Sequence, residues 1–183
     1  MKRFKENDIH AMVEILEKDG TLSVPTDTVY GVCCRYDHEA AQEKLRDVKK
    51  RPATKAFPIM CADEEQIKTI CDVDERSEKL IRAFMPGPVT LILPKKNSVP
   101  FYVNGGMPTL AIRMATSEPL KELIQSLGSP VFMTSANQSG EEVCTNLDEI
   151  EKHELARELL SPHLNAMFVT PKDIDEAVSK YNY

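Results

Sequence analysis

The sequence lacks the features that mark membrane and secreted proteins. Its longest apolar runs, such as residues 89–93, are only a few residues long, so no segment is long enough to cross a membrane. Residues 1–6 lead directly into polar sequence and contain no apolar core of a signal peptide. We therefore expect a cytoplasmic protein with no membrane contact.

An excess of positive charge is also missing. The chain has 23 Lys and Arg residues against 29 Asp and Glu residues, which gives a formal net charge of -6. Proteins that bind nucleic acid over a wide surface are normally basic. An anionic ligand must therefore be held by a local basic cluster, because the overall charge does not attract it.

The cysteines form no recognisable disulfide or metal-binding pattern. They are odd in number, no two form a C-x-x-C pair, and no secretion signal accompanies them. Their positions are 33, 34, 61, 71 and 144. We expect free thiols in a reducing compartment and no bound metal.

The chain of 183 residues is long enough to bury the core of one domain. Apolar periodicity predicts helices at 9–16, 38–50, 63–70, 74–85 and 119–127. In the helix at 74–85 we expect Leu80, Ile81 and Phe84 to be buried. The same periodicity predicts strands at 21–24, 57–61, 89–93, 110–114, 131–133 and 167–169, with tail helices before 161 and from 170. This alternation indicates an α/β (α+β) fold in which helices flank a twisted mixed sheet, and we expect a single domain over residues 1–183.

The densest basic segment is Lys-Lys-Arg-Pro-Ala-Thr-Lys at residues 49–55. Pro52 forces the chain to leave the preceding helix, so Arg51 and Lys55 are expected to converge beyond it. An arginine fork with mobile lysine ammoniums suits a polyphosphate. Cations at a helix C-terminus also complement the helix dipole, so a solvated surface is the alternative interpretation.

Three other polar segments lie at strand ends or in turns, where functional groups gather. Residues 25–31, Pro-Thr-Asp-Thr-Val-Tyr-Gly, suit a small zwitterion or form a turn that satisfies its own polar groups. Arg113 closes an apolar strand and needs either a ligand or a carboxylate partner. Residues 134–140 carry small hydroxyl and amide groups that suit phosphate or ribose, or again a self-satisfied turn.

Signatures of other catalytic classes are absent. The sequence has no Walker A motif, no G-x-G-x-x-G and no cluster of metal ligands. The histidines lie outside the polar segments and do not support a Ser/His/Asp triad: His10, His38, His153 and His163. Cys144 lies near the last segment, but no base for a nucleophilic thiol is evident.

Five motifs, in this order, resemble those of the YrdC-like family, the threonylcarbamoyl-AMP synthases. They are the motif at 25–31, Lys-x-Arg-Pro-x-x-Lys at 49–55, Pro-Gly-Pro-Val-Thr at 86–90, Ala-Ile-Arg at 111–113, and Ser-Ala-Asn-x-Ser-Gly at 135–140. The resemblance runs from about residue 8 to about residue 145. Five ordered motifs are far more specific than any one of them.

The resemblance implies a fold around a concave, positively lined cavity, and a nucleotidyltransferase activity. In the implied reaction, L-threonine, bicarbonate and ATP give threonylcarbamoyl-AMP and pyrophosphate, with Mg²⁺ held largely through the phosphates. The product then passes to a separate threonylcarbamoyl transferase complex that modifies tRNA. Contact with tRNA, or with double-stranded RNA, is a further expectation.

The resemblance also implies roles for individual residues. The implied catalytic set is Lys49, Arg51, Ser135 and Asn137. Lys55 and Thr109 join this set in holding ATP. Thr28 and Arg113 are expected to bind threonine, Arg113 through the carboxylate, with Thr26 as a further candidate. Such a site works by positioning and charge stabilisation, so it needs no nucleophilic side chain.

The chain departs from the family pattern in two places. The Ser-Thr-Val segment found after the last motif in many members is missing, and residues 151–183 diverge. Met60 stands where some members have a polar residue near threonine. Three alternatives stay open: an RNA-binding or ribosome-associated module that uses the same basic cavity, a nucleotide-binding paralogue without threonine chemistry, and a carbamoyl-transfer relative.

Overall fold

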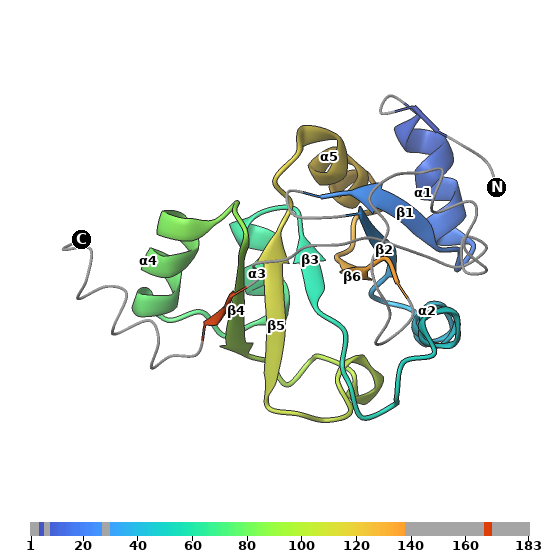
Figure 1. Ribbon diagram of the computed structural model, residues 1–183. Helices are drawn as coiled ribbons and strands as arrows, with labels where there is room; N and C mark the ends of the chain where they lie inside the picture. Colours follow the sequence, from blue (N-terminus) through green and yellow to red (C-terminus); the bar gives the residue numbers. More distant parts are fainter. Residues whose placement is uncertain (1–3, 6–7, 27–29, 138–166, 170–183) are drawn as a thin grey trace.

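The computed structural model describes residues 4–5, 8–26, 30–137 and 167–169. These residues form one seven-stranded mixed sheet with the order β1-β2-β6-β3-β5-β4-β7 (Figure 1). The strands are β1 Leu22–Pro25, β2 Tyr30–Arg35, β3 Ile59–Cys61, β4 Val89–Pro94, β5 Thr109–Met114, β6 Val131–Ser135 and β7 Met167–Val169. The pairs β3–β5 and β4–β7 are parallel, and the other neighbours are antiparallel. The predicted α/β class with a mixed sheet is confirmed.

Five α-helices lie among the described residues: α1 Ile9–Glu17, α2 Glu39–Lys49, α3 Glu64–Ile70, α4 Glu75–Phe84 and α5 Glu118–Leu127. A 3₁₀ turn, η1 Phe101–Val103, interrupts the long connection between β4 and β5. No helix in this part of the chain has the length and apolar character needed to cross a membrane.

The helices divide between the two faces of the sheet because alternate strand residues point to opposite sides. One face packs Cys33, Met60, Val131 and Met133 against the apolar stripes of α1 and α5. The other face packs a larger cluster that includes Ile112 and Phe132 against α2, α3 and α4. Figure 1 shows α1 and α5 side by side, with α2 and α4 at opposite ends of the sheet.

The helix ends follow the sequence signals. Asp63 Oδ1 accepts a 2.9 Å hydrogen bond from the backbone N–H of Gln66 at the start of α3, and Asp74 caps α4 in the same way through Ser77. Gly128 ends α5 with φ of +71°, a left-handed conformation that glycine adopts without a Cβ clash.

Two details differ from the sequence prediction. The strand β2, Tyr30–Arg35, was not predicted, although it pairs with both β1 and β6. Phe84 was expected in the core and is only partly buried at the end of α4. The predicted strand at 167–169 is confirmed, whereas the predicted tail helices fall outside the described residues.

Candidate active site

Three of the five predicted motifs, at 25–31, 49–55 and 135–140, meet at one end of the sheet, whereas the motifs at 86–90 and 111–113 lie toward the other end of β4 and β5. Strand β1 ends at Pro25, which is paired with Tyr30 at the start of β2. Strand β6 ends at Ser135, which is paired with Gly31. Thr109 begins β5 at the same end. Strand β3 lies between β5 and β6, parallel to β5 and antiparallel to β6, so the start of β5 is level with the end of β6. The end of α2 reaches this edge through Lys49.

Lys49 is the last residue of α2, and its ammonium group lies against the end of β6. Its Nζ donates hydrogen bonds to the carbonyl oxygen of Ser135 and, at 2.8 Å, to Oδ1 of Asn137. Ser135 Oγ donates to the same Asn137 oxygen at 2.8 Å. Three of the four predicted catalytic residues are therefore in direct contact, although Lys49 precedes the other two by more than 80 positions in the sequence.

The environment of Lys49 is unusual for a lysine, since the residue is only 2% exposed. Burial, and second the nearby charge of Arg51, lower its pKa from 10.5 to about 7. Near neutral pH the amine is therefore divided between its charged and neutral forms. A bound anion would restore the charge, because an opposite charge favours the protonated amine.

Arg51, the fourth residue of the set, lies just beyond α2 and closes a short turn. Its Nε donates to the carbonyl oxygen of Lys55 at 3.1 Å, and Nη2 donates to that of Ala56 at 2.7 Å. Its guanidinium also lies over the ring of Phe57, 4.9 Å from the centroid. The predicted departure of the chain at Pro52 is confirmed, and the Lys55 side chain is exposed.

A third cation completes the group, which we call the basic cluster: Arg46, Lys49 and Arg51. Their hydrogen-bond acceptors are backbone carbonyls and one side-chain amide. Among the residues that the structure describes, no carboxylate forms an ion pair with any of the three. Burial is the main cause that lowers the pKa of both arginines. The charge of Arg46 lowers the pKa of Arg51 further, whereas the carboxylate of Asp47 acts on Arg46 in the opposite direction. Partly buried cations without an ion-pair partner form a site for an anion.

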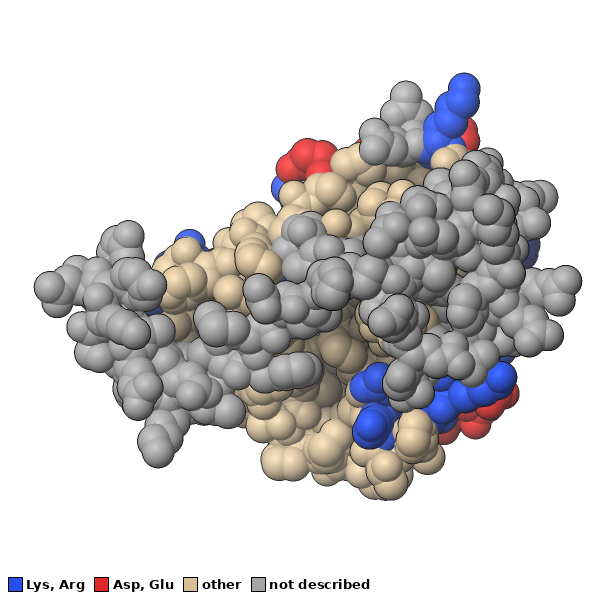
Figure 2. Space-filling view, in the orientation of Figure 1, with Lys and Arg blue, Asp and Glu red and all other residues tan. Residues whose placement is uncertain are grey.

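The surface view agrees with this placement. Figure 2 shows Lys and Arg side chains gathered at the lower right of the molecule, in the region that α2 occupies in Figure 1. In a chain with a net charge of -6, this local concentration contrasts with the overall balance. The enclosed basic cavity expected from the sequence stays a prediction.

The predicted threonine-binding arginine lies on the sheet face that packs against α1 and α5, whereas α2, which carries Arg46 and Lys49, packs on the other face. Arg113 is paired with Met60, which is paired with Val131, so strand alternation puts Arg113 and Ser135 on one face. Strand spacing and rise separate their Cα atoms by roughly 16 Å. Thr109 lies on this face as well, nearer to Ser135.

Other predicted residues are placed less completely. Thr26 follows β1, and its methyl carbon is 3.4 Å from the position that a Cβ on Gly31 would occupy. The absence of a side chain at Gly31 thus lets Thr26 and Met133 approach the strand end. Thr28 lies outside the described residues. Met60 is 1% exposed and packs in the core between β5 and β6, which places its side chain mainly among apolar neighbours.

The described cysteines are unsuited to nucleophilic chemistry. Cys33, Cys34, Cys61 and Cys71 are free and buried. Burial raises the pKa of Cys33 and Cys71 to about 12, and raises those of the other two thiols as well. These thiols are protonated at neutral pH and act as small apolar core residues. Cys144 lies outside the described residues.

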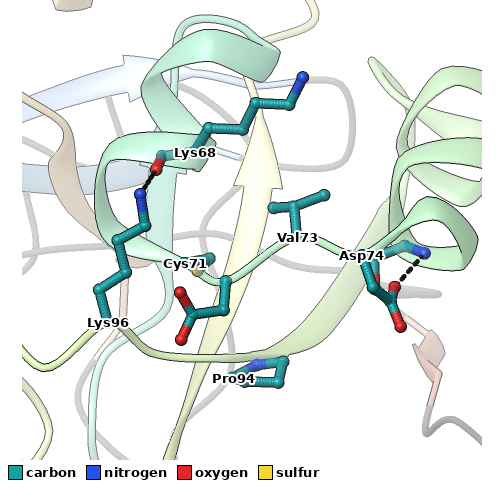
Figure 3. Close-up of a pocket in the computed structure, with 8 residues that line it drawn as sticks. Lys68, Cys71, Val73, Asp74, Pro94 and Lys96 are labelled. Atoms are coloured by element: carbon teal, nitrogen blue, oxygen red, sulfur yellow. Dashed lines mark hydrogen bonds between the residues drawn. The ribbon is translucent and has the colours of Figure 1, made fainter.

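A hollow of about 560 Å³ lies away from the basic cluster, between α3, α4 and the end of β4 (Figure 3). It is lined by Lys68, Cys71, Asp72, Val73, Asp74, Ser77, Pro94 and Lys96. Figure 3 shows two of its polar groups bonded within the protein: Lys96 Nζ donates to the Lys68 carbonyl oxygen, and Asp74 accepts from Ser77. None of the predicted site residues lines this hollow, and its polar groups serve to join α3 to β4 and to cap α4.

The sequence is similar to those of a known protein family. The family model described as "Telomere recombination", the Sua5–YciO–YrdC domain, matches residues 14–161. The chain belongs to this family. Its relatives include a threonylcarbamoyl-AMP synthase from Aliivibrio fischeri, 35% identical over 147 residues that cover 79% of this chain and 80% of the relative. Another from Escherichia coli O6:H1 is 30% identical over 174 residues, which cover 93% of this chain and 92% of the relative.

A solved structure of the YrdC-like family shares the fold. The structure of Sua5 from P. abyssi in complex with L-threonine superposes with a TM-score of 0.71 and 33% sequence identity. The match covers 79% of this chain and 42% of the longer Sua5 chain. The predicted family is thereby confirmed, and so is the expectation that the chain has the α/β fold of this family.

Proposed function

We propose that this protein is a threonylcarbamoyl-AMP synthase that uses L-threonine, bicarbonate and ATP to supply an intermediate of tRNA modification. The observation that carries the proposal is the basic cluster with its neutral partners, at the place where three of the five family motifs meet. A triphosphate provides the negative charge that these buried cations lack. The names of the two threonylcarbamoyl-AMP synthases described above support the same reaction.

The proposed chemistry needs two bond-forming steps. The threonine amine and bicarbonate combine to a carbamate with loss of water. A carbamate oxygen then attacks the α-phosphorus of ATP, and the bond from that phosphorus to the bridging oxygen of pyrophosphate breaks. The product is a mixed anhydride, threonylcarbamoyl-AMP, and the electron pair of the broken bond leaves with pyrophosphate.

The residues act by holding charge in place. We propose that Lys49 and Arg51 bind the phosphates and stabilise the charge that moves to the leaving pyrophosphate, with Ser135 and Asn137 orienting Lys49. Lys55 and Thr109 add contacts to ATP. Arg113 binds the threonine carboxylate, with Thr26 and Thr28 as hydroxyl donors to the amino acid.

Mg²⁺ enters the proposal as part of the substrate. Among the described residues, no three His, Cys, Asp or Glu side chains gather in a metal-binding group. The hydroxyl and amide oxygens of Ser135 and Asn137 are hard donors, but they alone do not make a magnesium cage. We propose that the ion is carried by the ATP phosphates and neutralises part of their charge.

The remaining parts of the proposal concern organisation and partners. We propose that residues 1–183 form one domain that works in the cytoplasm. Its product passes to a threonylcarbamoyl transferase complex, and the basic cluster is the surface that would meet tRNA or double-stranded RNA.

The decisive experiment is mass spectrometry of a reaction with all three substrates. We expect threonylcarbamoyl-AMP and one equivalent of pyrophosphate, and neither when threonine or bicarbonate is left out. Pyrophosphate formed without threonine would refute the proposed reaction. Salt-dependent tRNA binding that charge reversal at Lys49 and Arg51 abolishes, with no pyrophosphate formed, would instead favour the RNA-binding alternative.

Replacing Arg113 with methionine should separate the two substrates. Loss of a charged contact to the carboxylate is expected to raise KM for threonine by roughly 10- to 100-fold. KM for ATP should change less than about twofold, because Arg113 lies far from the basic cluster. Steady-state kinetics with each substrate varied would measure both values. Arg35→Met, which breaks an ion pair with Asp37 elsewhere on the sheet, is the control. An equal rise in both constants would contradict the proposed division.

ATP binding should be coupled to proton uptake at Lys49. At pH 8 the free protein carries this amine mostly neutral, since its pKa is about 7. The phosphates raise the pKa again, so binding takes up close to one proton at pH 8 and little at pH 6 from this residue. Calorimetry in buffers of different ionisation enthalpy measures the uptake. Lys49→Arg, which stays protonated, should abolish it, and uptake that persists in this variant would contradict the assignment.

A further inference from the structure

Arg46 is a residue of the basic cluster that no sequence motif identifies. It lies in the last turn of α2, three residues before Lys49. Its Nη1 donates to the carbonyl oxygen of Pro52 at 2.9 Å and to that of Lys55 at 3.2 Å. These two acceptors lie at the start and near the end of the turn that follows the helix, so one guanidinium spans the whole turn.

Arg51 approaches the same turn from the other side. Its Nε donates to the Lys55 carbonyl oxygen, which therefore accepts from both arginines. The two guanidinium carbons also lie near the same Phe57 ring, 5.1 Å and 4.9 Å from its centroid. Phe57 is 2% exposed, so the ring provides a fixed surface for both cations.

This arrangement brings two like charges onto one carbonyl and one ring. Burial, and second the nearby Arg46 charge, lower the pKa of Arg51, and the effect of Arg46 has the direction expected for repulsion between the two guanidiniums. A turn stabilised only for folding would not need a second cation there, whereas a turn that receives an anion gains from it. The backbone N–H of Arg51 also donates to the Arg46 carbonyl oxygen at 3.0 Å, which fixes where Arg51 leaves the helix.

We propose that Arg46 is a positioning residue for nucleotide binding, and this rests on the proposed function. Arg46 does not itself bind the phosphates. It holds the backbone of residues 51–55 in one conformation, and this fixes the positions from which the Arg51 and Lys55 side chains reach the phosphates. Without it the turn samples other conformations, and ATP binds only the fraction of molecules in which the turn is formed.

The test compares Arg46→Gln and Arg46→Lys with the wild type, and with Arg82→Gln as a matched control. Arg82 is a solvent-exposed arginine of another helix, α4, with a side chain that is 62% exposed. Arg46→Gln should raise KM for ATP about tenfold, leave KM for threonine within about twofold and leave kcat nearly unchanged. Hydrogen exchange of the amides in 51–57 should become faster, whereas that of β6 should not. Arg46→Lys should restore only part of the ATP affinity, since an ammonium lacks the fork that reaches both carbonyls.

Three results would overturn the assignment. One is an unchanged KM for ATP despite faster exchange in the turn. Another is full recovery in Arg46→Lys, which would show that charge alone matters. The third is an equal loss for ATP and threonine, which is expected of a general folding defect. Binding of inorganic tripolyphosphate gives a readout independent of turnover. If the wild type binds tripolyphosphate but forms no product from ATP, threonine and bicarbonate, the proposed function fails. The tripolyphosphate affinities of the Arg46 variants then still test the positioning role.

Discussion

Arg51→Ala is expected to lower threonylcarbamoyl-AMP synthesis by about a hundredfold or more while the protein stays folded. The guanidinium is the donor best shaped to hold two phosphate oxygens at once, and alanine removes both its charge and its fork. The measurement is product formation by mass spectrometry, alongside circular dichroism and a melting curve. The melting temperature should fall by no more than about 5 °C, because the Arg51 side chain makes two hydrogen bonds to the turn and one contact to Phe57 among the described residues.

The controls for Arg51 separate charge from geometry. Arg51→Lys keeps a cation but loses the paired donation to the Lys55 and Ala56 carbonyls. We expect it to recover a minor part of the activity. Arg82→Ala removes an exposed arginine from α4 and should leave activity unchanged. Full turnover in Arg51→Ala would refute the assigned role of the cluster.

Lys49→Met is expected to abolish measurable synthesis without a loss of stability at acidic and neutral pH. The variant removes the cation nearest to Ser135 and Asn137, so a loss of about a hundredfold is the minimum expected. Methionine fills a similar volume without carrying a charge into a site that is 2% exposed. Replacing a buried charge by a well-packed apolar side chain is often neutral or stabilising.

The pH dependence of this stability has a definite sign. The pKa of Lys49 is about 7 in the folded protein against an ordinary 10.5, so between these values the unfolded state binds more protons. The stability contributed by this residue therefore rises with pH across that window, and below pH 7 the folded state carries the full penalty of a buried charge. The melting temperature of Lys49→Met relative to wild type should be higher at pH 6 than at pH 9. A difference that does not vary with pH would show that the amine is not titrating in this window.

The sequence was most informative where a signal is local. Asp63, Asp74 and Gly128 mark helix ends by chemistry that acts within one turn, and the structure has each helix end there. Strand β2 escaped prediction because its residues follow a polar motif without alternation. Four of its residues are buried in succession, and that burial comes from neighbouring strands and from helices on both faces.

The residues of the candidate site could be predicted from the sequence, but the contacts between their side chains could not. Motif order placed Lys49, Ser135 and Asn137 in one group, but nothing local indicates that Lys49 bonds to the end of β6. The contribution of Arg46 and Phe57 was missed for a related reason. Arg46 resembles any helix cation, and Phe57 any core aromatic, until the turn between them brings both against Arg51.

The amide at position 137 has a chemical consequence for the lifetime of the enzyme. Its oxygen accepts from both Lys49 and Ser135, so a neutral group stands opposite the buried amine. Hydrolysis of that amide to a carboxylate would give Lys49 a permanent counter-ion. The Lys49 ammonium would then form an ion pair within the protein, and a triphosphate would have to compete with that carboxylate for it. Slow ageing of one asparagine would in this way produce a protein that folds as well as before and binds its nucleotide poorly.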